Sequence, residues 1–221
     1  MKCFSDRTLE FFMAIRFNNN REFFHENHDW YLADVRTPAL ELADALSGDI
    51  EKLDAELERR PNRVVSRLAR DIRFSRDKSP YRDNMWLSFR MADNERRRRP
   101  EFYFGLSAEG SDCGMGFYNI TRAQTDAWRT VLTTHTEECI AAIETAYAAG
   151  FGMSGERYKK IAVPDDLDER LKEWYPVKNF WVNKAIPLKT ALSEELKDAL
   201  AEDIASLTPL YRLFSLIGDI E

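Results

Sequence analysis

The chain has 221 residues, of which 44% are hydrophobic and 12% are aromatic. This composition excludes a disordered protein, because so many apolar side chains can be buried that their burial offsets the entropy lost on ordering. Charged residues interrupt every apolar run before the roughly 18 residues that a bilayer span needs, so we expect no association with a membrane. The length suits one domain, and we expect residues 1–221 to form it.

The N-terminus and the cysteines indicate a cytoplasmic protein. The first residues, MKCFSDR, reach charge at once and lack the apolar stretch of a secretory signal. Cys3, Cys113 and Cys139 are odd in number and widely spaced, and they form no Cys-x-x-Cys pair. We therefore expect reduced thiols, no metal site and no cofactor.

The net charge of −6 hides an uneven distribution. Residues 63–99 hold twelve basic and five acidic residues, a net charge of +7, which leaves −13 on the rest of the chain. Such a concentration of positive charge is typical of an anion site, although pairing with acidic helices of the same molecule is the alternative. The arginine run at residues 96–99 could contact phosphates, but the sequence pI near 5.3 makes nucleic acid an unlikely partner.

The first part of the chain, residues 1–60, is predicted to be helical. Apolar side chains recur at helical spacing between residues 9 and 17, after Ser5, which can cap the helix. A run of three asparagines then ends this helix, because asparagine favours turns. Asn19 and Glu22 have the spacing of a capping box, so a second helix is expected to begin there.

The middle part, residues 64–119, is predicted to form the sheet, because the apolar period changes to two. The alternation predicts strands at residues 68–74, 85–91, 102–106 and 113–117. Short polar links between them favour an antiparallel meander.

In the last part, residues 120–221, we expect a helix at 121–149, a strand at 180–188 and a terminal helix at 193–217, interrupted or restarted at Pro209. Helices on either side of a block of strands predict an α+β fold. Its antiparallel sheet should have about four to six strands, flanked by N-terminal, middle and C-terminal helices.

The richest group of polar side chains lies at residues 70–81, which read RDIRFSRDKSPY. If Arg73 lies on a strand, Asp71 shares its face, because side chains repeat every two residues. Pro80 ends regular pairing, so residues 77–78 should form a turn beyond the strand. Carboxylates, a guanidinium, an ammonium and a phenol would then lie near one point.

This grouping predicts a site for a small anionic molecule. Arginine can hold a carboxylate or a phosphate with two parallel hydrogen bonds, and lysine adds a point charge. Asp71 or Asp77 would orient these cations or act as a base. The predicted ligand-binding residues are Arg21, Asp71, Arg73, Asp77, Lys78 and Tyr81.

The same residues also fit a structural role. Arg73 paired with Asp71 or Asp77 would make the motif an ion-pair clasp, in a binding or scaffold protein without catalysis. Gly114 and Gly116 leave bare backbone on one side of their strand. That side is either a pocket floor beside the motif or the bed of a large aromatic residue such as Trp128.

The run at residues 70–81 resembles the signature of the domain-of-unknown-function family 2461, and the similarity extends over almost the whole chain. The other matching pieces are Phe11-Phe12, NNREFF at 19–24, residues 103–107, GMG at 114–116, Arg129 and KNF at 178–180. The resemblance implies that Asn20, Arg21, Arg70, Asp71, Arg73, Asp77, Lys78 and Tyr81 occupy motif positions. It implies no activity, because none is assigned to that family. Arg82-Asp83 and residues 159–164 depart from the family pattern, which puts roles for Arg82 and Lys159 in doubt.

Two further patterns are discounted. Ser75 and Lys78 have the Ser-x-x-Lys spacing of acylating serine enzymes, but Pro80 makes the required helix improbable and no companion motif is present. His25 and His28 are interpreted as part of a solvated helix face rather than as metal ligands.

Overall fold

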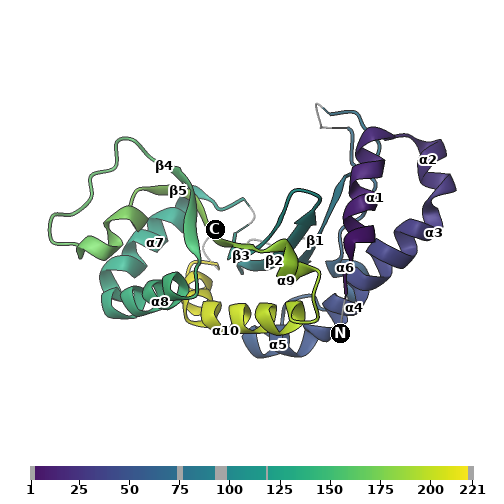
Figure 1. Cartoon of the computed structure of the whole chain (residues 1–221). Coiled ribbons are helices and arrows are strands. Elements are labelled where there is room, and N and C mark those ends of the chain that lie inside the picture. Colours follow the sequence, from purple (N-terminus) through teal and green to yellow (C-terminus); the bar gives the residue numbers. More distant parts are fainter. Residues whose placement is uncertain (1–2, 74–76, 93–98, 118, 219–221) are drawn as a thin grey trace.

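The structure is a computed structural model that describes residues 3–73, 77–92, 99–117 and 119–218. A five-stranded antiparallel sheet in the order β1-β2-β3-β5-β4 lies at its centre. The N-terminal helices stand at one side of the sheet, helices α7 and α8 stand at the other, and α10 runs along one face (Figure 1). This arrangement confirms the predicted α+β fold, in which an antiparallel sheet is flanked by N-terminal, middle and C-terminal helices.

Three of the four strands predicted for the middle of the chain are present, and they form a meander. The strands of the sheet are β1 (Asn84–Phe89), β2 (Glu101–Ser107), β3 (Ser111–Gly116), β4 (Gly152–Arg157) and β5 (Val177–Ile186). The predicted strand at residues 68–74 is wrong: its described part makes only one isolated bridge, between Ala69 and Tyr81. The Asp71 carboxylate accepts the backbone N–H of Arg73 there, which favours a turn over a ladder.

The C-terminal part of the chain also contributes to the sheet. Strand β5 confirms the strand predicted at 180–188, although it begins earlier and ends before Pro187, which has no N–H to donate. Strand β4 is an edge strand that the sequence did not reveal. It is short, mostly exposed and contains two glycines, so it lacks the apolar alternation that marks a buried strand.

The N-terminal part is helical, as predicted. Its helices are α1 (Asp6–Phe17), α2 (Arg21–Glu26), α3 (His28–Tyr31), the π-helical turn η1 (Leu32–Arg36), α4 (Thr37–Ala45), α5 (Ser47–Leu53) and α6 (Pro61–Val64). Ser5 precedes α1 as expected, but the cap of α2 is Asn20 and not Asn19. The Asn20 side chain accepts the N–H of Phe23, which leaves the side chain of Asn19 for another contact.

The remaining helices follow the prediction with two corrections. They are α7 (Arg122–Thr134), α8 (Thr136–Ala148), the 3-10 turn η3 (Glu169–Trp174), α9 (Leu188–Ala191) and α10 (Leu196–Ser215). The helix expected at 121–149 is two helices that meet at His135, and α10 continues through Pro209. Leu207 and Leu210 are fully buried on either side of Pro209, so packing outweighs the lost hydrogen bond. Among the described helices, none combines the length and apolarity that crossing a bilayer requires.

One face of the sheet forms the core. Five side chains of this face are fully buried: Leu87, Phe89, Phe102, Phe104 and Met115. In β1 and β2 such residues alternate with less deeply buried ones. Beyond β5 the core continues as an aromatic cluster whose ring centroids lie 5.1–6.4 Å apart. The members of that cluster are Trp128, Trp174, Phe180 and Phe214.

A buried carboxylate ties α10 to the sheet. Asp203 is 4% exposed and forms an ion pair with Lys184 of β5. It also accepts a hydrogen bond from the Cys113 thiol of β3, at 3.3 Å between Sγ and Oδ2. Burial raises the pKa of Cys113, so the thiol keeps its proton and can donate. Lys184 Nζ donates a further bond to the Ala149 carbonyl, 3.2 Å away.

Replacing Asp203 by alanine should destabilise the fold by about 3 kcal/mol, because it leaves the ammonium of Lys184 without its carboxylate. Asp198→Ala is the matched control on the same helix, since Asp198 is 80% exposed and should cost less than about 0.5 kcal/mol. Urea unfolding of the two variants measures the difference. Equal losses would contradict the role given to Asp203.

Candidate functional site

The family-like run lies on an extended arm, residues 66–83, that leaves the edge of the sheet beside β1. Its two sides pair with each other: Arg70 N–H donates to the Pro80 carbonyl and Arg82 N–H donates to the Leu68 carbonyl, each at 2.8 Å. The described residues 71–73 and 77–79 belong to the tip of this arm. Residues 74–76, including Ser75, lie outside the described residues.

The charged groups of the tip pair with one another at the surface. Arg73 donates to both oxygens of Asp71, from Nε at 3.0 Å and from Nη2 at 2.7 Å. Arg70 lies 3.2 Å from Asp77. The side chains of Arg73 and Asp71 are 76% and 51% exposed, so this pair contributes little to stability.

The six predicted ligand-binding residues do not all meet at one point. Lys78 donates to the backbone carbonyl of Ile72 at 2.8 Å and stays exposed at the tip. Arg21 begins α2, is exposed, and makes no hydrogen bond or ion pair with a described residue of the tip. Tyr81 lies at the base of the tip, and its ring packs on Phe24 with centroids 4.5 Å apart.

One contact between the arm and the N-terminal helices comes from Asn19. Its side-chain carboxamide donates to the Tyr81 carbonyl at 2.9 Å and accepts the Tyr81 N–H at 3.0 Å. These two bonds replace the ladder partners that Tyr81 would have in a sheet. The bonds of Asn19 and the ion pair between Arg16 of α1 and Asp83 therefore both fasten the arm to the N-terminal helices.

Arg82, a position where the sequence departs from the family pattern, fastens the arm to the sheet. Its guanidinium lies 4.8 Å from the centroid of the Trp86 ring on β1, within range for a cation–π contact. The same group donates to the carbonyls of Arg67 and Ala69 at 2.9 and 2.7 Å. Burial lowers the pKa of Arg82. The two carbonyl oxygens accept hydrogen bonds from the guanidinium group and so compensate for part of its lost hydration.

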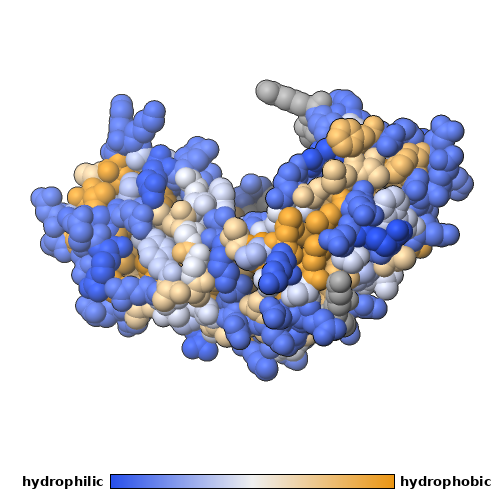
Figure 2. Space-filling model, in the orientation of Figure 1, coloured by the Kyte–Doolittle hydropathy of each residue, from blue (hydrophilic) through white to orange (hydrophobic). Residues whose placement is uncertain are grey.

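The sheet face opposite the core carries polar and aromatic side chains, and we call it the open face. Figure 2 shows that the surface is hollowed between the two flanking groups of helices, where the sheet lies in Figure 1. On strands β1 to β3 the open face consists of Asn84, Trp86, Ser88, Glu101, Tyr103, Gly105, Ser107, Asp112, Gly114 and Gly116.

The glycines of β3 lie under aromatic rings of the open face. A Cβ on Gly114 would stand 2.3 Å from the Val182 carbonyl oxygen and 2.9 Å from the Tyr103 ring, and one on Gly116 would stand 2.5 Å from Cβ of Trp181. The neighbouring aromatics are thus Tyr103 and Trp181. Trp128 packs in the core cluster instead, and the nearest atoms to Gly114 belong to neither Arg73 nor Lys78.

A cavity of about 610 Å³, which we call the basic cavity, opens between the base of the arm and β1. Three arginines of the segment that carries the +7 charge, Arg63, Arg67 and Arg90, line it. Arg63 and Arg67 are exposed and form no ion pair with any described residue. The other lining residues are Asn62, Val64, Val65, Ser66, Trp86, Ser88 and Glu101.

The floor of the basic cavity offers hydroxyl and carboxylate groups beside these guanidinium groups. The Ser88 hydroxyl donates to Glu101 at 2.7 Å. The Ser66 oxygen accepts the Trp86 N–H at 3.0 Å, so its own proton can be donated elsewhere. A bound anion could therefore receive hydrogen bonds from Ser66 and from the arginines.

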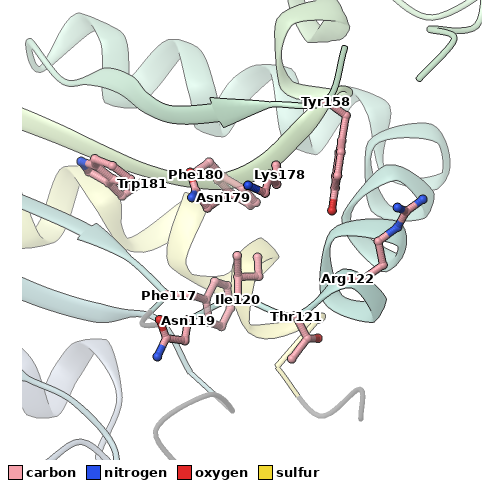
Figure 3. A pocket seen from close by; sticks show the side chains of 10 residues that line it. All are labelled: Phe117, Asn119, Ile120, Thr121, Arg122, Tyr158, Lys178, Asn179, Phe180 and Trp181. Atoms are coloured by element: carbon pink, nitrogen blue, oxygen red, sulfur yellow. The ribbon is translucent and has the colours of Figure 1, made fainter. Parts of the chain in front are cut away.

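A second cavity, of about 540 Å³, lies where β5 begins and the chain passes from β3 to α7 (Figure 3). Tyr158 points into it from one side and Ile120 and Phe117 from another. Its cations are paired: Lys178 lies 2.6 Å from Glu156, and Arg122 lies 3.4 Å from Asp126. This cavity therefore suits an anion less well than the basic cavity does.

The cysteines are buried, and the described histidines join no cluster suited to a metal ion. All three cysteines are buried and free, and burial raises the pKa of each, for Cys139 to about 12. None is thus a thiolate near neutral pH. No cluster of His, Cys, Asp and Glu suited to a metal ion occurs among residues 3–73, 77–92, 99–117 and 119–218.

The residues of the basic cavity were not predicted individually. Trp86, Ser88 and Arg90 alternate with buried residues along and just after β1, and this polar period of two was the available signal. Arg63 and Arg67 follow no such period. The bridge between Val65, which follows α6, and Leu87 of β1 brings them to the same place.

Asn19→Ala should destabilise the protein by about 1–3 kcal/mol, because both backbone groups of Tyr81 lose a partner. Arg73→Ala should cost less than about 0.5 kcal/mol, since its ion pair is exposed. Urea unfolding compares the variants, and amide hydrogen exchange at Tyr81 should accelerate only in Asn19→Ala. If Arg73→Ala proves the more damaging change, the ion-pair clasp is the correct description.

The pKa of Asp71 should be about 2, because hydrogen bonds from Arg73 favour its charged form. The pKa of this carboxyl group is lower in the folded protein than in the unfolded chain, so its stabilising effect is fully present above the ordinary pKa near 4. The effect is lost as the pH falls towards 2. A pH titration followed by NMR measures the value, and Arg73→Ala should return it to the ordinary range. An unchanged pKa in that variant would show that the pair does not form in solution.

Comparison of the sequence with known protein families gives a match that covers both the arm and the sheet. Residues 7–213 match the family described as "Conserved hypothetical protein (DUF2461)". None of the curated proteins matches the chain. Since the match spans the helices, the arm and all five strands, the chain belongs to the DUF2461 family.

Proposed function

We propose that this protein binds a small anionic molecule in the basic cavity, on the open face of the sheet. The observation that carries the proposal is the convergence of Arg63, Arg67 and Arg90 on one cavity of about 610 Å³. That volume lies in the range of pockets that hold small ligands. Arginine is suited to carboxylates and phosphates, because its fork of donors matches two oxygens at once.

The immediate surroundings support an anion rather than a cation. Two of the arginines, Arg63 and Arg67, form no ion pair with described residues, whereas most carboxylates near the arm are already paired. Asp71 and Asp77 bond to arginines of the tip, and Asp83 bonds to Arg16 of α1. Although the Glu101 carboxylate also lines the cavity, an incoming anion would meet the charges of Arg63 and Arg67, which form no ion pair with described residues.

The tip of the arm is a second position for the anion. Arg73 and Lys78 are exposed there, and Tyr81 stands at its base. Their existing bonds to Asp71 and to the Ile72 carbonyl would have to be exchanged for bonds to the ligand. We therefore rank the tip, with Arg21, Asp71 and Asp77 as accessory groups, below the basic cavity.

A thermal-shift screen of carboxylates and phosphate esters tests the proposal. Any anion that stabilises the wild type should stabilise Arg67→Ala and Arg63→Ala less, with binding weakened about tenfold, because each variant removes one charge-assisted contact. Isothermal titration calorimetry then gives the dissociation constants.

Two control variants decide the position. Arg212→Ala removes an exposed arginine from α10, on the core side of the sheet, and should bind like the wild type. Arg73→Ala should also bind like the wild type if the basic cavity is the site. Weakened binding in Arg73→Ala alone would move the site to the tip. Equal binding by all the variants would refute both positions.

A further inference from the structure

A third cavity, which we call the acceptor cavity, adjoins the basic cavity on the open face. It has a volume of about 400 Å³ and lies over the middle of β1, β2 and β3. Trp86 lines both cavities, so its indole stands between them. The other lining residues are Asn84, Met85, Tyr103, Gly105, Leu106, Ser107, Gly110 and Asp112.

The polar groups of the acceptor cavity are mainly hydrogen-bond acceptors. Asp112 accepts the Tyr103 hydroxyl on Oδ2 at 2.8 Å, while its Oδ1 receives no hydrogen bond from a described residue. Burial raises the pKa of Tyr103, so this phenol stays a donor to Asp112. Gly105 lies opposite Asp112, and a Cβ there would stand 2.9 Å from Oδ1. The glycine thus leaves room for that oxygen.

Asn84 lines the same cavity and carries an unsatisfied acceptor. Oδ1 of Asn84 is buried and has no hydrogen-bond partner among the described residues. A buried acceptor without a donor costs free energy, and a ligand could recover it only if the Asn84 side chain turned towards the cavity. The Asp112 carboxylate and the rings of Trp86 and Tyr103 make an environment suited to an ammonium group.

The cations around this cavity have partners of their own. Arg82, which stacks on Trp86, donates to two backbone carbonyls. Arg16 bonds to Asp83 and to Glu109. The Asp112 carboxylate is therefore not matched by a described ion pair and can receive a cation.

We infer that the ligand of the open face is a zwitterion, with an anionic group in the basic cavity and an ammonium group in the acceptor cavity. This inference rests on the proposed function and adds a substrate class to it. Arg67 follows Ser66, which bonds to the backbone of β1, and Asp112 lies on β3. With strands about 4.8 Å apart, the two ends of the ligand are separated by roughly 10–15 Å.

Short oligoglycine peptides are zwitterions of adjustable length and provide the probe. Extended triglycine and tetraglycine span about 10 and 14 Å, whereas diglycine spans about 7 Å. Each is titrated by calorimetry into the wild type, together with its N-acetyl form, which lacks the ammonium, and its C-terminal amide, which lacks the carboxylate. Asp112→Asn keeps an oxygen for the Tyr103 hydroxyl and removes the negative charge. Asp198→Asn, on exposed α10 surface, is the matched control.

Triglycine or tetraglycine should bind the wild type and Asp198→Asn at least tenfold more tightly than its N-acetyl form, and diglycine should bind more weakly. In Asp112→Asn the advantage of the free ammonium should disappear. Equal binding of free and acetylated peptides by the wild type would overturn the inference, whatever the stability of the variant.

The outcomes separate this inference from the proposed function. If N-acetyl peptides bind as well as free peptides and Arg67→Ala weakens both, the anion site stands and the zwitterion is refuted. If the C-terminal amides bind as well as the acids, the anion site fails. If no peptide binds, the inference is also overturned. In that case the proposed function is still tested separately, by the screen of carboxylates and phosphate esters.

Discussion

The division of the sheet into two unlike faces is the constraint on which the rest of the structure depends. Side chains of a strand alternate between faces, so burying Leu87 and Phe89 on one side forces Trp86 and Ser88 to the other. Helix α10 covers the apolar face, and the ion pair of Asp203 holds it there. No described helix takes the equivalent position over the middle of β1–β3 on the open face, where cavities remain.

The arm shows how a segment rich in charge can be attached without a ladder of strand hydrogen bonds. Asn19 supplies the backbone partners of Tyr81, and Arg82 combines contact with the Trp86 ring with two bonds to carbonyls. Both attachments use side chains with several donors or acceptors in fixed planes. The tip beyond them carries ion pairs that are well exposed, which separates the part that anchors the arm from the part that faces solvent.

Trp86 connects the structural and the proposed functional roles of the open face. Its backbone N–H bonds to Ser66, its ring receives Arg82, and its edges line the basic and the acceptor cavities. Three arginines with Glu101 line the cavity on one side of Trp86, and Asp112 lines the cavity on the other. A ligand with two unlike ends would be oriented by this charge order, because reversing it would place like charges together.

The sequence by itself determined the α+β class, three adjacent strands of the sheet and the helical ends, because these follow from local periodicity. It also pointed to the DUF2461 family through the run at residues 70–81, and the match over residues 7–213 confirms the family. It misjudged the strand at 68–74, because the bonds of Asp71 to Arg73 are local and override alternation.

Only the tertiary structure decided which distant residues share a cavity. Arg63 and Arg67 meet β1 because Val65 and Ser66, between them, pair with that strand, and Asp112 faces Gly105 because of the strand register. Strand β4 has little apolar pattern of its own and joins the sheet through pairing with β5. Periodicity reports which face a side chain takes, but the neighbours of that side chain depend on contacts between segments that are far apart along the chain.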